Sequence, residues 1–162
     1  TRARFCAGDK EIGRKFEAIR SAVLQLHRDD QKLKDEVIQM RKRMRDANQN
    51  RSDLFDLKHD YGGMIDIEFI VQYLILRHAH QHPELTGNLG NIALLKRCGE
   101  LGLIPQDQAF ATANAYRMLR KFQHNIRLQG DEKARVKHEK VAEAVRASKQ
   151  LWECIFGEET IR

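Results

Sequence analysis

The chain has 162 residues, which fits one domain, and it carries a modest formal net charge of +6. Two prolines and 7% aromatic residues exclude a collagen-like chain and a turn-rich β-sandwich, while 41% hydrophobic residues suffice for a packed core. Three widely spaced cysteines without a C-x-x-C pair exclude a disulfide framework and a zinc site, and they predict a reducing, cytoplasmic location.

The first part of the chain predicts two amphipathic helices. Apolar residues recur at spacings of four and three over residues 12–26 and again over 33–47. The first apolar stripe consists of Ile12, Phe16, Ile19, Val23 and Leu26. Asp29 or Asp30 is placed to cap the second helix. Because consecutive helices with a short connection usually pack antiparallel, we expect these two to form an αα-hairpin.

A central helix is predicted after a polar loop. Residues 48–61 break the helical period, with a brief extended piece expected near 54–57. Residues 64–76 are apolar on almost every side of a helix, which is typical of a helix buried on all sides. Pro83 sets the end of this helix, so it should cover about 62–82. The apolar run is too short to cross a bilayer, so no membrane association is expected.

The remaining sequence predicts three further helices. A short one covers about 91–101, with Gly102 suited to end it and Pro105 suited to begin the next. The last two helices carry the apolar stripes Ala115, Leu119, Phe122, Ile126 and Val141, Val145, Ser148, Leu151, Trp152, Ile155. The prediction is an all-α bundle of about six helices around the 62–82 helix, without strand pairing, forming one domain over 1–162.

Polar residues inside the central helix mark the candidate functional site. Asp66 and Glu68 lie in an otherwise apolar run, and burying a carboxylate is costly unless it is paired or faces a polar cleft. Lys58 and the pair Gly62-Gly63 precede them, and a lysine beside a helix N-terminus can form an anion site. The alternative is a buried structural ion network. Arg14 and Arg41 are candidate partners in that network.

Three other features favour structural interpretations over functional ones. His78 and His82 share a helix face, but no carboxylate or cysteine nearby completes a metal site, so a solvated helix end is expected. The basic run 41–45 is expected to be an exposed helix face, with an acidic partner as the alternative. Cys98 and Cys154 lie on or beside apolar stripes and are predicted to be core residues. No complete active-site motif is present.

The order of residues around the polar cluster resembles a known signature. The sequence FDLKHDYGGMIDIEFIVQYL, residues 55–74, is similar to the Lys…Gly-Gly…Asp-Ile-Glu-Phe…Gln-Tyr-Leu pattern of the bifunctional glutamine synthetase adenylyltransferase/adenylyl-removing enzyme family. The resemblance covers most of residues 1–130 and fades after Gln129. The Asp-Ile-Glu-Phe form resembles the second, adenylylating half of that family. The chain, which begins at Thr1 without a methionine, is therefore expected to be a piece of a longer protein.

The resemblance implies a division of labour within that longer protein. The chain would be the C-terminal helical domain of the adenylyltransferase half, and the catalytic core would lie upstream. That core would bind Mg²⁺, so no catalytic or metal-binding residue is expected here. The parent would transfer AMP from ATP to a tyrosine of glutamine synthetase, under control of glutamine and a PII signalling protein. The residues expected to line or adjoin the nucleotide cleft are Lys58, Gly62, Gly63, Asp66 and Glu68.

A non-enzymatic module is the alternative function. Residues 90–130 carry six bases against two acids, which would suit nucleic acid or an acidic protein. Nucleic-acid binding does not require the polar cluster between Lys58 and Gln72, so it is the less favoured of the two. Steep salt dependence of binding to a generic duplex would distinguish this alternative.

Overall fold

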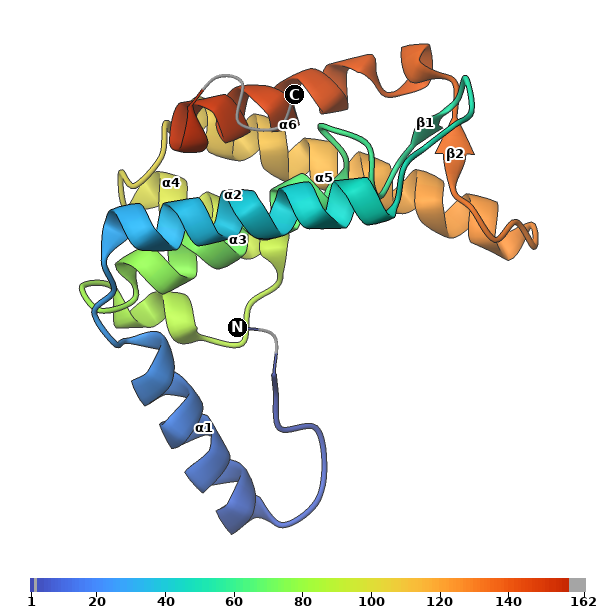
Figure 1. The fold of residues 1–162 in the computed structure, drawn as a ribbon. Helices are drawn as coiled ribbons and strands as arrows, with labels where there is room; N and C mark the ends of the chain where they lie inside the picture. The colour runs from blue at the N-terminus through green and yellow to red at the C-terminus, as the bar shows by residue number, and fades with distance from the viewer. Residues whose placement is uncertain (2, 158–162) are drawn as a thin grey trace.

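The fold is a bundle of α-helices with one very small sheet. A computed structural model describes residue 1 and residues 3–157; Arg2 in the N-terminal stretch and residues 158–162 of the predicted domain lie outside the described residues. The elements are α1 (Lys10–Leu24), α2 (Asp30–Ala47), β1 (Phe55–Asp56), α3 (Met64–His78), η1 (Pro83–Thr86), α4 (Asn91–Glu100), α5 (Gln106–Leu128), β2 (Arg135–Val136), η2 (His138–Lys140) and α6 (Ala142–Phe156). The predicted all-α class is confirmed (Figure 1).

Helix α3 is the centre of the bundle, as its composition predicts. It contacts α2, α4, α5 and α6, and nine of its fifteen residues are buried. Ile67 and Ile70 have no exposed surface, whereas the predicted flanks at 62–63 and 79–82 form turns. No helix among the described residues is long and apolar enough to span a membrane.

The predicted hairpin of the first two helices is wrong. Helix α1 projects away from the other helices (Figure 1). Its apolar stripe is exposed, since Ile12 is 66% and Ile19 64% accessible. The adjacent stripe of α1 turns inward instead. There Leu24 is buried, and the Arg20 guanidinium donates a hydrogen bond to the carbonyl oxygen of Thr86. Both stripes have helical spacing, so periodicity alone could not identify the inward one.

The prediction of no strand pairing is also wrong. β1 pairs antiparallel with β2, with Phe55 opposite Val136 and Asp56 opposite Arg135. The Leu57 N–H extends the contact by donating to the Ala134 carbonyl oxygen at 3.0 Å. Each strand has only two residues, which is too short to show the alternation that identifies a strand. The small sheet ties the loop before α3 to the segment between α5 and α6.

The cysteines divide into one buried and two exposed thiols. Cys98 is 1% accessible, and burial raises its pKa to about 12, which confirms it as a core residue. Cys154 is exposed, so its predicted core position is wrong; it follows the buried residues Leu151 and Trp152 but faces solvent. Cys6 is exposed as well. The apolar stripe predicts which face of a helix is buried, but a residue at the margin of that stripe can be either buried or exposed.

Candidate functional site

A buried ion pair lies behind the turn that precedes α3. The Arg41 Nε donates to Asp66 Oδ1, and both side chains have no exposed surface. A second Arg41 nitrogen donates to the His59 carbonyl oxygen at 2.8 Å, and the Gly62 N–H donates to Asp66 Oδ2 at 2.6 Å. Burial raises the pKa of Asp66, and Arg41 and the Gly62 N–H oppose that rise. Of the two candidate partners in the sequence, the structure pairs Arg41 with Asp66.

The backbone of the Gly-Gly turn is fully engaged inside the protein. The Gly63 N–H donates to the Asp60 carbonyl oxygen at 2.9 Å, the Met64 N–H to the Leu57 oxygen at 2.9 Å, and the Ile65 N–H to the Lys58 oxygen at 3.2 Å. With Gly62 bonded to Asp66, these amides do not point at open space. An anion at this end of α3 would therefore be bound by side chains.

Position 62 requires glycine, both because of the backbone conformation there and because of the side chains around it. Its φ is +88°, and a Cβ there would lie 2.7 Å from Val145 Cγ1. We expect Gly62→Ala to lower the free energy of unfolding by about 2–4 kcal/mol, from left-handed backbone strain plus overpacking. Gly102→Ala is the matched control, because Gly102 has φ +70° but open space around it, so it should cost only ~1 kcal/mol. Chemical denaturation of both variants measures the difference; equal losses would contradict the packing argument.

A polar groove lies between α3 and α5. It has a volume of about 570 Å³, and we call it the α3–α5 groove. Its lining consists of Met44, Lys58, Met64, Ile65, Glu68, Phe69, Gln72, Tyr116, Arg120, Gln123 and Arg127. Of the five predicted site residues, Lys58 and Glu68 line the groove, whereas Gly62, Gly63 and Asp66 are buried beside it.

Glu68 has a partner within the groove. The Tyr116 hydroxyl donates to Glu68 Oε1 at 2.9 Å, which explains how a carboxylate is tolerated in an apolar helix. Burial raises the pKa of Tyr116, and the neighbouring Glu68 raises it further, whereas Asn91 and Arg120 contacts lower it. The Gln72 side-chain amide donates to the Glu68 carbonyl oxygen at 3.2 Å. The Tyr116 hydroxyl thus holds the Glu68 carboxylate in place in the lining of the groove.

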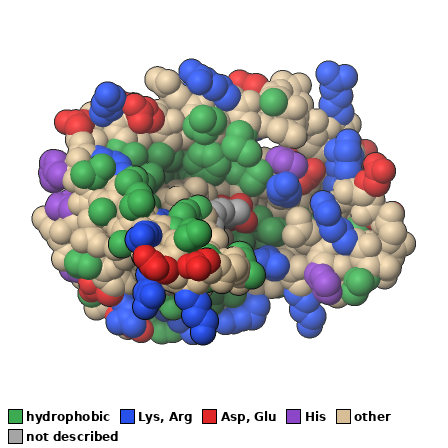
Figure 2. Space-filling model, turned by 90° about the horizontal axis from the view of Figure 1, so that it is seen from below, with side chains coloured by type: hydrophobic (Ala, Val, Ile, Leu, Met, Phe, Trp, Pro, Cys, Tyr) green, Lys and Arg blue, Asp and Glu red, His purple; other side chains and the backbone are tan. Residues whose placement is uncertain are grey.

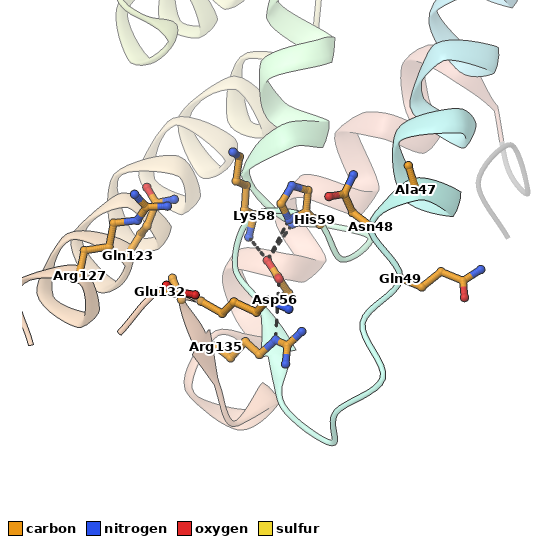
Figure 3. Close-up of a pocket in the computed structure, with 12 residues that line it drawn as sticks. Ala47, Asn48, Gln49, Asp56, Lys58, His59, Gln123, Arg127, Glu132 and Arg135 are labelled. Carbon is orange, nitrogen blue, oxygen red and sulfur yellow. Dashed lines mark hydrogen bonds and ion pairs between the residues drawn. The ribbon is translucent and has the colours of Figure 1, made fainter. Parts of the chain in front are cut away.

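The position of Lys58 is set by Asp56. One Asp56 oxygen accepts hydrogen bonds from the Lys58 N–H at 2.9 Å and the His59 N–H at 3.0 Å, which fixes the turn. Arg135 Nε lies 3.9 Å from the other oxygen. Figure 3 shows the Lys58 side chain extending away from Asp56, with Arg127 of α5 across a second, smaller hollow of about 270 Å³.

Lys58 and Arg127 line both hollows, so they form the basic rim between them. Lys58 is exposed, and no ion pair that the structure records between described residues involves either side chain. Two cations that make no recorded ion pair with a described residue, at the edge of a groove, can contact phosphate oxygens. The described residues contain no group of three His, Cys, Asp or Glu side chains that could hold a metal ion.

The sequence reasoning missed the contribution of α5 to the groove. Tyr116, Arg120, Gln123 and Arg127 follow one another at spacings of four, three and four, which places them on one face of α5. Each of these residues directly follows a residue of the predicted apolar stripe of α5. Leu119 of that stripe is fully buried. The spacing was a usable signal, but only the fold shows that this face meets α3.

Comparison with known proteins identifies the family. Residues 31–153 match the family model described as GlnD PII-uridylyltransferase. The chain belongs to this family. The match extends beyond Gln129, so the expected fading of similarity after that residue is wrong.

Relatives named bifunctional glutamine synthetase adenylyltransferase/adenylyl-removing enzyme align with nearly the whole chain. The protein from Aromatoleum aromaticum is 52% identical over 97% of this chain, and the one from Bordetella bronchiseptica is 50% identical over 99%. The Nitrosomonas eutropha protein is 49% identical over 97% of the chain. The aligned region is 17%, 17% and 18% of these relatives, so this family member spans about one sixth of their length. The resemblance carried by residues 55–74 is confirmed.

Proposed function

We propose that the chain is a helical domain of a longer enzyme that transfers AMP from ATP to a tyrosine of glutamine synthetase. The observation that carries this proposal is sequence identity to proteins named for that activity. About half of the aligned residues are identical, over nearly the whole chain. The family model is named for uridylyl transfer, which is also a nucleotidyl transfer. The high identity to adenylyltransferases favours AMP as the transferred group.

Within this enzyme, the α3–α5 groove would form a wall of the nucleotide cleft. Nucleotidyl transfer depends on positioning and on neutralising charge on phosphate oxygens. The Lys58 ammonium would contact a phosphate, and the neighbouring rim residue Arg127 would add positive charge. Glu68, held by the Tyr116 hydroxyl, would accept a hydrogen bond from the nucleotide. Gly62, Gly63 and Asp66 would act indirectly by holding the turn that carries Lys58.

The remaining parts of the proposal concern the parent protein. Mg²⁺ would neutralise charge on the phosphates, and its ligands would belong to a catalytic core outside this chain. Thr1 donates a hydrogen bond to Gln72 at the edge of the groove, so a core joined upstream of Thr1 would adjoin the same cleft. Glutamine and a PII signalling protein would regulate the enzyme, in the cytoplasm. An exposed face of the bundle would dock glutamine synthetase.

The test compares the full-length protein with the 162-residue chain. With labelled ATP, Mg²⁺ and purified glutamine synthetase, the full-length protein should transfer label to a tyrosine of glutamine synthetase. The chain alone should transfer none, because no metal-binding group exists among its described residues. Mass spectrometry of glutamine synthetase locates the label. AMP transfer by the isolated chain, or a full-length protein that labels only PII, would contradict the proposal.

A further inference from the structure

Helix α1 carries a continuous apolar face that the described residues leave exposed. The face consists of Ile12, Phe16, Ile19 and Val23 of α1, which are 66%, 36%, 64% and 49% accessible, and it continues into Leu26 just past the helix end, which is 59% accessible. Figure 2 views the molecule from the side to which α1 projects, and hydrophobic side chains gather on that side. Single exposed apolar residues are ordinary, but four in one helical stripe, with a fifth directly after the helix, are typical of an interaction surface.

The exposure of this face does not arise from a loosely attached helix. Phe5 packs over Gly13, where a Cβ would lie only 2.8 Å from the Phe5 ring, and the Phe5 N–H donates to Glu17 at 3.2 Å. Arg20 is bonded to both Glu17 and the Thr86 carbonyl oxygen. The Arg20–Thr86 bond joins this side of α1 to the bundle, and the Phe5 contacts join it to the preceding loop. The orientation that exposes the apolar stripe is therefore built into the fold.

A second copy of the chain is a poor occupant for this surface. The stripe has the four–three spacing of a coiled coil, but it extends for only about two heptads. Stable coiled-coil pairing generally needs about three to four heptads. An isolated pair of such short helices would also be marginal in water. The apolar face of α1 is therefore better suited to pack against a larger apolar surface than against α1 of a second copy.

We propose that the apolar face of α1 packs against another part of the same full-length polypeptide. This inference rests on the proposed function, in which the chain is one domain of a longer enzyme. About five sixths of the length of the relatives lies outside the aligned region, so a large surface within the same protein is available to cover the face. The α1 face is then an interdomain contact that fixes the helical bundle relative to the rest of the enzyme.

The experiment introduces Ile19→Gln and Val23→Gln together, in the 162-residue chain and in the full-length protein. Glutamine is a good helix former, so the change removes apolar area without breaking α1. The melting temperature of the chain alone should stay unchanged, because both side chains are exposed there. In the full-length protein, loss of the contact should lower the melting temperature by about 5 °C or more. Leu128→Gln is the control, since Leu128 is 74% exposed on α5 and should change neither protein.

Hydrogen exchange of the wild-type proteins gives a second measurement that does not depend on variants. Amides of residues 12–26 should exchange at least about tenfold more slowly in the full-length protein than in the chain alone. Equal exchange, together with unchanged melting of the double variant in an active full-length enzyme, would overturn the inference while leaving the proposed function intact. A wild-type chain that sediments as a dimer, and a double variant that sediments as a monomer, would assign the face to a second copy and also overturn it. An inactive full-length protein with a protected α1 would instead contradict the proposed function.

Discussion

Lys58→Ala in the full-length enzyme is expected to lower kcat/KM for ATP by about ten- to a hundredfold, with little change in melting temperature. A charge-assisted contact to phosphate contributes about 1.5–3 kcal/mol, and each ~1.4 kcal/mol is a factor of ten in rate. Stability should be preserved because the Lys58 side chain is exposed and makes no recorded ion pair with the described residues. Steady-state adenylylation of glutamine synthetase and a thermal melt measure the two effects.

Lys121→Ala is the matched control for Lys58. Lys121 is an exposed cation of α5 that does not line the α3–α5 groove, so removing it changes net charge equally without removing a groove contact. The kcat/KM of the Lys121→Ala enzyme for ATP should stay within about twofold of wild type, because exposed charges are largely screened at physiological salt. If Lys58→Ala keeps wild-type kinetics but loses stability, the groove residue is structural and the cleft assignment is wrong.

Arg41→Met is expected to produce the largest loss of stability, about 3–5 kcal/mol. The methionine retains much of the side-chain volume, but Asp66 loses its buried counter-charge and the His59 carbonyl loses its donor. Breaking a buried ion pair from one side leaves an uncompensated buried charge, which is far more costly than losing a surface pair. Urea denaturation of the 162-residue chain measures the free energy of unfolding.

Arg43→Met tests whether the effect belongs to the buried pair. Arg43 is exposed and lies two residues from Arg41 on the same helix, so its replacement should change stability by less than about 0.5 kcal/mol. Similar losses for the two variants would mean that the basic run stabilises α2 through its total charge. A loss of under about 1 kcal/mol for Arg41→Met would show that the pair contributes little.

The central helix could be predicted because its sequence leaves one physical solution. An apolar surface on all sides requires burial on all sides, and Ile67 and Ile70 are fully buried as that argument demands. The turn before α3 was also predictable, since Gly62 and Gly63 precede the helix and their acidic neighbour Asp66 can bind the free N–H groups. That a buried carboxylate here needs a basic partner, such as Arg14 or Arg41, also follows from the sequence, whereas the choice of Arg41 is made by the fold.

Other features depend on contacts that local sequence does not encode. The exposed stripe with Ile19 follows the same period as a core stripe, so its direction is set by contacts such as that of Arg20 with Thr86. The pairing of Phe55 with Val136 joins segments far apart in the chain, with only two residues in each strand. The groove likewise forms only where Tyr116 of α5 meets Glu68 of α3. Tertiary packing decides all three.

If the α3–α5 groove is a wall of the nucleotide cleft, bound ATP should protect it in the full-length enzyme. Gln123→Cys places a thiol in the groove lining, and Asn114→Cys places one on α5 in a separate hollow against α6. Alkylation at each position is followed by mass spectrometry, with and without saturating ATP. ATP should slow alkylation at position 123 several-fold and leave the rate at position 114 unchanged. Equal alkylation rates at position 123 with and without ATP, in an enzyme that still binds ATP, would contradict it.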